Sequence, residues 1–207
     1  MTASVAIYLY PEVEVLDFAG PYEVFTTASR VFKRLNPAAP APFMVSTVAN
    51  QTGTVRSRAG LVVTPDFTFA DHPAIDLLII PGGLVSAELE KPEVIEWIRC
   101  TAAMTRITAS VCTGASLLAR AGLLDGKRAT THWGDVDDLR TAFPAVTVLE
   151  QRRWVDEGDI VTSAGISAGI DMSLHLVERF ADRELALKTA RQMDYHWHED
   201  ATEKPNT

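Results

Sequence analysis

The chain has 207 residues, of which 47% are apolar and 22% are charged, an ordinary composition for one globular domain. Its formal net charge is −8 and its basic residues are scattered, so no nucleic acid partner is expected, because such partners need clustered Lys and Arg. No apolar run approaches the roughly 18 residues of a membrane span, and the first residues do not have the features of a signal peptide. The two cysteines make no disulfide framework. We therefore expect a cytoplasmic protein that does not enter a membrane.

Short apolar runs alternate along the chain with segments of helical periodicity. The expected strands lie at residues 4–10, 43–48, 76–81, 107–111, 128–131, 146–149, 153–156 and 160–163, with a hairpin at 55–64. The expected helices lie within residues 16–32, 92–104, 114–121, 133–142, 167–180 and 183–193. This alternation predicts an α/β domain with a mostly parallel sheet and helices on both faces. We expect one domain over residues 1–200 and a frayed polar tail over 201–207.

Three of the expected strands end in loops that carry candidate site residues. These are Asp17, the Gly82-Gly83 pair and Cys112. Because sites in such sheets lie outside the carboxyl ends of the strands, we expect the three loops to converge on one crevice. Asp17 lies just before an expected helix start, where an aspartate most often caps the helix, so this structural role competes with that of a site carboxylate.

The stretch ITASVCTGASLLARA predicts a strand that turns sharply into a helix at Cys112, followed at once by Gly114. This is the layout of a nucleophile elbow. A helix N-terminus favours the thiolate, so we expect the elbow to lower the pKa of the thiol. The N–H groups of Thr113 and of the loop at Gly82 and Gly83 could hold the sulfur or an anion that develops on the substrate. Two structural interpretations compete with this one. Cys112 could be a buried residue of the core, and the Pro-Gly-Gly sequence could simply form a turn.

A thiol nucleophile needs a group that manages its proton. Asp17 is the candidate, since burial near another anion raises the pKa of a carboxyl and favours its protonated form. The hydroxyl of Thr113 could hold water or a substrate atom, or could merely satisfy the first helical turn. His132 follows an expected strand and could serve the cysteine as a base or contact the substrate, but a histidine that only bonds to backbone is the stronger interpretation.

No metal ion or other cofactor is expected. His196 and His198 have i,i+2 spacing without further ligands. The glycines within residues 163–171 lack the fuller pattern and the lysine of a phosphate cradle, so they predict close packing of a helix on a strand. Cys100 lies in the middle of an expected helix and is interpreted as a small buried apolar residue.

Five motifs occur in order along nearly the whole chain. They are LDFAGP at 16–21, IPGG at 80–83, SVCTGA at 110–115, GLLDGKRATTHW at 122–133 and SAGISAGID at 163–171. With these motifs, the chain resembles the DJ-1/PfpI superfamily and, within it, the isonitrile hydratases. The resemblance implies a flavodoxin-like three-layer sandwich with the cysteine at a nucleophile elbow, usually assembled as a homodimer.

The resemblance also implies roles for single residues. Cys112 matches the nucleophile of the family and Asp17 its essential acidic residue. Thr113 matches the residue after the nucleophile in isonitrile hydratases, where the protease and glyoxalase-like branches often have histidine. The motif set also occurs in the N-terminal halves of AraC-type regulators, but this chain ends at Thr207 and its charge is wrong for DNA, so we expect no DNA-binding domain.

The predicted function is hydration of an isonitrile, a small-molecule substrate, to an N-substituted formamide. Cys112 would form a thioimidate, Asp17 would act as acid and base, and Thr113 would position water. The substrate would also lie near Gly82, Gly83, Gly114 and His132. Two alternatives stay open: a non-catalytic domain that binds a small molecule or senses oxidants, and a hydrolase or deglycase that acts on carbonyl substrates.

Overall fold

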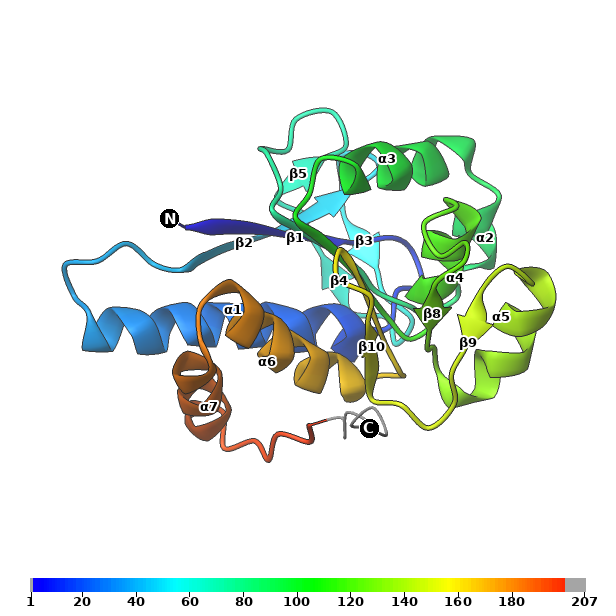
Figure 1. Ribbon diagram of the computed structural model, residues 1–207. Helices are drawn as coiled ribbons and strands as arrows, with labels where there is room; N and C mark the ends of the chain where they lie inside the picture. Colours follow the sequence, from blue (N-terminus) through cyan, green and yellow to red (C-terminus); the bar gives the residue numbers. More distant parts are fainter. Residues whose placement is uncertain (1, 200–207) are drawn as a thin grey trace, which may run out of the picture.

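A seven-stranded sheet forms the middle layer of the protein in this computed structural model, which describes residues 2–199 (Figure 1). Its strand order is β10-β11-β7-β6-β1-β2-β5, and only β10 and β11 pair in antiparallel fashion. The strands are β1 (Ala3–Tyr8), β2 (Phe43–Ala49), β5 (Phe67–Thr68), β6 (Leu77–Ile80), β7 (Ile107–Val111), β10 (Trp154–Asp156) and β11 (Ile160–Ser163). The predicted, mostly parallel sheet is therefore confirmed.

Helices cover both faces of this sheet, as Figure 1 shows. On one face α1 (Val15–Leu35), α6 (Ala168–Phe180) and α7 (Arg183–Gln192) pack together, and on the other α2 (Ser86–Leu89), α3 (Pro92–Ala102) and α4 (Gly114–Arg120) do so. Every residue of β1, β6 and β7 is buried. Their sequences are mostly apolar because both of their faces are covered.

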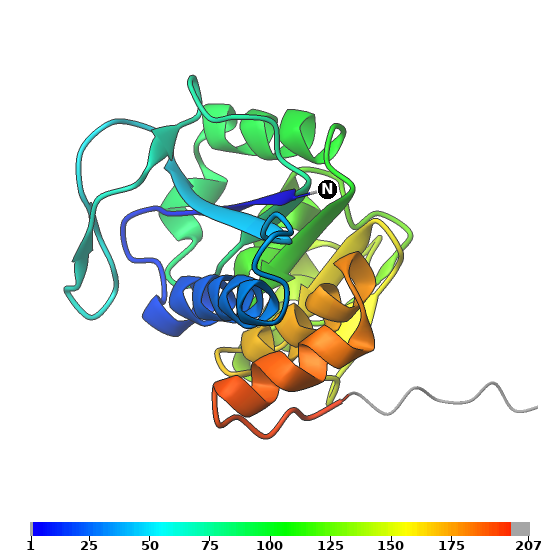
Figure 2. The same ribbon diagram turned by 90° about the vertical axis from the view of Figure 1, so that its left-hand side faces the viewer.

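Two small ribbons complete the fold. The predicted hairpin is β3 (Val55–Arg56) paired with β4 (Val62–Val63), and it stands out from the sheet on the side away from α6 and α7 (Figure 2). Beside the main sheet, β8 (Arg128–Ala129) pairs with β9 (Thr147–Val148), flanked by the 3-10 turn η1 (Trp133–Asp135) and α5 (Val136–Ala142). The short elements β5 and α2 were not predicted.

The start of α1 differs from the prediction. The helix begins at Val15, with Glu14 at its N-cap, so Asp17 lies inside the first turn and is not the cap. Pro21 lies inside the helix and not in its first turn. Because proline has no N–H, it removes the helical hydrogen bond that the Asp17 carbonyl would otherwise accept.

Cys100 is exposed, which contradicts its interpretation as a buried apolar residue. Helix α3 buries Val94, Ile98 and Thr101, so Cys100 lies on the outer side, where its thiol donates a hydrogen bond to Glu96 Oε1 at 3.1 Å. In residues 2–199 no helix is long and apolar enough to cross a membrane. The tail predicted at residues 201–207 lies outside the described residues.

Candidate functional site

The loops that follow β1, β6 and β7 meet at the carboxyl edge of the sheet, as predicted. There the Gly82 N–H donates to Asp17 Oδ2 at 3.0 Å. A Cβ atom at Gly82 would lie 2.6 Å from the backbone nitrogen of Thr113 and 2.9 Å from Asp17 Oδ2. Only glycine fits where the loop after β6 passes between the acid and the elbow.

Cys112 forms a strained turn between β7 and α4. Its φ of 58° is a left-handed conformation that is costly for a residue other than glycine. The surrounding backbone holds this turn in place: the Cys112 N–H lies 3.2 Å from Ser163 O and 3.3 Å from Ala164 O, and the Cys112 carbonyl accepts from Thr131 Oγ1 at 2.9 Å. The strand-turn-helix geometry of a nucleophile elbow is present.

The Asp17 carboxyl is completely buried. Burial, opposed by the hydrogen bond from Gly82, raises the pKa of Asp17 to about 7. The Cys112 thiol and the Ile166 N–H lie close enough to favour the charged form. Even so, within residues 2–199 Oδ1 has no hydrogen-bond partner of ordinary geometry. The charge of Glu14 adds to the effect of burial, so Asp17 can hold a proton near neutral pH, as predicted for a buried carboxyl beside another anion.

The pKa of Cys112 is raised, not lowered. Cys112 is 7% exposed, and burial together with the charge of Asp17 raises its pKa to about 12. The N–H and hydroxyl of Thr113 act in the opposite direction. The expected lowering by the elbow is therefore wrong, because the start of α4 does not offset the loss of water around the sulfur and the repulsion from Asp17.

Asp17 and Cys112 titrate as a pair. Repulsion keeps them from being ionised together near neutral pH, so above about 7 the pair carries one negative charge and one proton. Transfer of that proton from sulfur to the carboxyl leaves the net charge of the site unchanged. The pair can therefore present a thiolate beside a carboxylic acid, or a thiol beside a carboxylate.

Asp17 should make the stability of the protein depend on pH. Between about pH 4 and about pH 7 the unfolded chain loses the Asp17 proton while the folded form keeps it. The contribution of Asp17 is therefore complete below about pH 4 and is lost as the pH rises through about 7. Urea unfolding of the wild type and Asp17→Asn across this range should give a free-energy difference that changes by several kcal/mol, at about 1.4 kcal/mol per unit of pKa shift. A difference that is independent of pH would contradict the raised pKa.

The hydroxyl of Thr113 is bonded to the backbone of Gly83 in both directions. It donates to Gly83 O at 3.0 Å and accepts from Gly83 N at 2.9 Å. The Gly82 and Gly83 N–H groups, expected to face an anion on the substrate, thus bond to Asp17 and Thr113. The Thr113 N–H remains close to the sulfur. Contacts of these groups with substrate or water stay predictions.

Gly114 permits the close approach of α4 to β6. A Cβ atom there would lie 2.1 Å from the carbonyl oxygen of Ile80. Gly169 does the same for α6, since its Cβ would lie 2.8 Å from Val111 Cγ1. This confirms close packing as the reason for the glycines near residue 165.

His132 is part of a polar turn beside the elbow. Its Nδ1 lies 2.9 Å from Asp135 Oδ2 and 3.2 Å from the Gly134 nitrogen. Its ring packs so closely on Gly165 that a Cβ there would lie 2.3 Å from Cδ2. The structure thus gives His132 local partners in a side chain and in the backbone, while a contact with substrate stays a prediction.

No metal-binding cluster of three or more His, Cys, Asp or Glu side chains occurs in the described part of the chain, residues 2–199. Of the candidate pair, His198 uses its backbone N–H to bond to Asp171 Oδ1 at 2.9 Å. The Asp171 carboxylate is buried and also bonds to the guanidinium of Arg153. These contacts fasten the end of the described chain to α6.

Tyr10 is the residue at this site that the sequence did not reveal. Its hydroxyl donates to Pro81 O at 3.1 Å, on the loop that holds Asp17. The available signal was weak: a second tyrosine two residues after Tyr8, at the carboxyl end of a strand. Alternation places both side chains on one face, but it does not say what their hydroxyls contact.

Comparison with known proteins agrees with this geometry. The DJ-1/PfpI family matches residues 3–179. Isonitrile hydratase of Pseudomonas putida is 36% identical over 196 residues, which is 94% of this chain and 79% of that protein. The HTH-type transcriptional regulator GbdR of Pseudomonas aeruginosa is 35% identical over 136 residues, so the match covers 66% of this chain and only 37% of the regulator.

A solved structure gives the same fold. The crystal structure of a ThiJ/PfpI family protein from Pseudomonas syringae superimposes with a TM-score of 0.83 at 28% sequence identity. The superposition covers 96% of this chain and 77% of that one. The predicted flavodoxin-like α/β sandwich is therefore confirmed.

Proposed function

The chain belongs to the DJ-1/PfpI family, and from this premise we propose that it hydrates an isonitrile to an N-substituted formamide at Cys112 and Asp17. The observation that carries the proposal is the buried pair itself. A carboxyl whose pKa is about 7 lies beside a thiol at an elbow, so a nucleophile and a proton donor occupy one site. The similarity to an isonitrile hydratase over most of the chain supports the choice of substrate.

The first step joins the thiol to the terminal carbon of the isonitrile. Asp17 takes the proton of Cys112 and delivers it to that carbon, while the sulfur forms a bond to the same carbon. The product is a thioimidate, R–N=CH–S, on Cys112. The N–H of Thr113 stabilises the sulfur while it carries charge.

The second step adds water to the thioimidate. Asp17 removes a proton from water as the oxygen attacks the carbon, and the nitrogen gains a proton. The carbon–sulfur bond then breaks, the sulfur regains a proton, and R–NH–CHO leaves. One water is consumed and no electrons are exchanged, so no cofactor is required by this mechanism.

The backbone around the pair has a positioning role in this proposal. Thr113 ties the elbow to Gly83 through two hydrogen bonds, and Gly82 holds the acid. If the hydroxyl of Thr113 releases one of these bonds, it can place the attacking water. His132 follows Thr131, whose hydroxyl bonds to the Cys112 carbonyl, and in this proposal its side chain contacts the R group of the substrate.

The limited access to the sulfur favours a slender substrate. Cys112 is 7% exposed, so a bulky carbonyl compound would need a larger movement of the site before it could be attacked. An isonitrile presents its reactive carbon at the end of a linear group. Hydration of an isonitrile therefore fits the buried sulfur better than hydrolase or deglycase chemistry on a carbonyl substrate.

The proposal is tested by incubating the protein with an alkyl isonitrile and following the formamide proton by NMR. We expect formamide in amounts well above the protein concentration. We also expect kcat/KM to rise through about pH 7, because the singly ionised pair is the active form. The assay should cover about one unit below and about two units above this pKa. Absence of turnover across that whole range would contradict the proposal.

A second candidate is a domain without turnover that binds a small molecule or senses oxidants. The observation in its favour is the match of 35% identity to part of the regulator GbdR. A negative isonitrile assay together with preferential oxidation of Cys112 over the exposed Cys100 by mild peroxide would favour an oxidant sensor. Peptide mass spectrometry distinguishes the two cysteines.

A further inference from the structure

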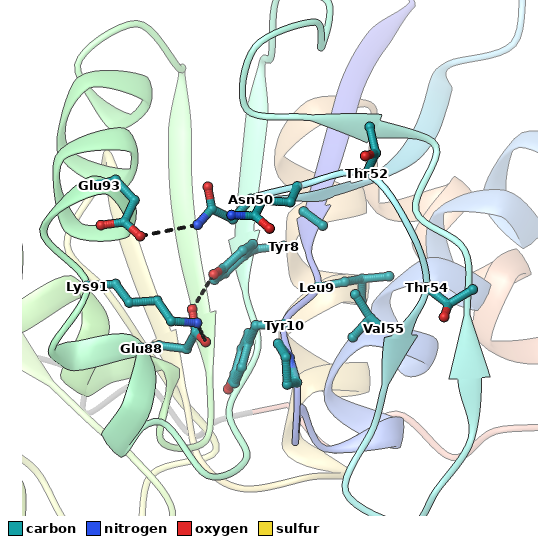
Figure 3. A pocket seen from close by; sticks show the side chains of 13 residues that line it. Tyr8, Leu9, Tyr10, Asn50, Thr52, Thr54, Val55, Glu88, Lys91 and Glu93 are labelled. Atoms are coloured by element: carbon teal, nitrogen blue, oxygen red, sulfur yellow. Dashed lines mark hydrogen bonds and ion pairs between the residues drawn. The ribbon is translucent and has the colours of Figure 1, made fainter.

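Tyr10 lies two residues beyond the end of β1 and is 1% exposed. Its ring and that of Tyr8 stand next to one another, with centroids 5.2 Å apart. Both residues line a cavity of about 260 Å³, together with Glu88, Lys91 and Glu93. Figure 3 shows both rings at the β1 side of this cavity. The two tyrosines share an environment, but their hydroxyls have different partners.

The hydroxyl of Tyr8 bonds to the ion pair of Glu88 and Lys91 in this cavity. It donates to Glu88 Oε2 at 2.5 Å, and Lys91 Nζ lies 2.6 Å from Glu88 Oε1 (Figure 3). The buried carboxylate of Glu88 is thus satisfied by its neighbours. The hydroxyl of Tyr10 instead donates to Pro81 O at 3.1 Å, on the loop of the Cys112 site.

One peptide group connects Tyr10 to Asp17. The carbonyl of Pro81 and the N–H of Gly82 belong to the same planar unit. Its carbonyl accepts from Tyr10, and its N–H donates to Asp17 Oδ2 at 3.0 Å. Rotation of this unit about its ends would break both hydrogen bonds together.

The next part of the loop is held by other residues. The Gly82 carbonyl accepts from Glu14 N at 2.9 Å, and the Gly83 N–H donates to Thr113 Oγ1 at 2.9 Å. These contacts fix the unit between the two glycines but not the unit before it. That unit can flip by a change in one dihedral of Pro81 and one of Gly82, and glycine offers little steric resistance to such a change.

We propose that Tyr10 is a positioning residue that holds the Pro81-Gly82 peptide group in the orientation in which its N–H bonds to Asp17. Through this peptide group it sets how readily the Asp17 carboxyl ionises beside Cys112. The consequence for catalysis rests on the proposed function, whereas the consequence for Asp17 does not. Burial and the charges of Asp17 and Glu88 raise the pKa of Tyr10 well above its usual value, so its hydroxyl remains a donor.

The test is the titration of the Asp17 carboxyl carbon by NMR in protein labelled at its aspartate carboxyls, with the signal assigned by its absence in Asp17→Asn. In Tyr10→Phe the Gly82 N–H is held less firmly, so the carboxylate loses stabilisation. We expect the midpoint of the Asp17 titration to rise by about half a pH unit to one pH unit. Tyr10→Met, which also lacks a donor, should give the same shift if the first variant does not fold.

Tyr8→Phe is the matched control, because it removes a buried hydroxyl from the same strand that bonds to Glu88. Its Asp17 midpoint should equal that of the wild type. An unchanged midpoint in Tyr10→Phe, or an equal rise in Tyr8→Phe, would overturn the proposal. With isonitrile as substrate, Tyr10→Phe should move the pH profile of kcat/KM by the same amount and change KM little. If the wild type hydrates no isonitrile, the proposed function fails, while the carbon titration still decides the role of Tyr10.

Discussion

A Cys112→Ala variant is expected to form no formamide above the uncatalysed background, a loss of at least about a thousand-fold in kcat. The sulfur of Cys112 is the atom that bonds to the isonitrile carbon in the proposed mechanism. Alanine has no sulfur, so the thioimidate cannot form. Asp17 alone cannot replace it, because a general acid without a nucleophile only assists the slow attack of water. The measurement is formamide production by NMR at equal protein concentrations.

The chain supplies a matched control in its other cysteine. Cys100 is exposed on α3, where its thiol donates to Glu96, so Cys100→Ala should keep wild-type kcat and KM. Mass spectrometry during turnover should find the covalent adduct on Cys112 alone. Full activity of Cys112→Ala, with the fold intact by circular dichroism, would exclude the proposed mechanism.

The largest effect on stability is expected for Gly114→Ala, with a loss of about 2–4 kcal/mol in the free energy of unfolding. The added Cβ would lie 2.1 Å from the carbonyl oxygen of Ile80, a contact that only a shift of backbone can relieve. Neither β6 nor α4 can shift easily, because every residue of β6 and five of the seven residues of α4 are buried. Urea unfolding followed by tryptophan fluorescence measures the change.

Gly134→Ala is the control for this substitution. A Cβ at Gly134 would lie 3.3 Å from the ring of His132, which is a much milder contact than the one at Gly114. Its cost should stay below about 1 kcal/mol. Equal losses for the two variants would mean that the close approach at Gly114 has no special importance.

The architecture and the meeting of the site loops were predictable because both follow from apolar patterning. The strands β1, β6 and β7 are buried on both faces, so their sequences are mostly apolar and do not alternate with charged residues. Once these are parallel strands, the loops after them must leave from one edge. Asp17 and Cys112 come together for this reason, although they lie far apart in the sequence.

The electrostatics of the site were not predictable in the same way. The elbow alone argues for an acidic thiol, and only the structure reveals that burial and Asp17 have the larger effect on the pKa of Cys112. The start of α1 was misplaced because Pro21 is typical of a first turn, whereas Glu14 caps the helix seven residues earlier. The hydroxyl of Tyr10 bonds to a carbonyl that is remote in sequence, which no local pattern specifies.

The site is assembled from segments that are distant along the chain, and this has a consequence for folding. The hydrogen bond between Asp17 and Gly82 joins residues 65 positions apart, and the bonds between Gly83 and Thr113 join residues 30 positions apart. Closing such loops costs entropy that is recovered only when the parallel sheet has formed. A partly folded chain therefore carries the cysteine without its acid, so chemical competence is among the last properties to be gained during folding.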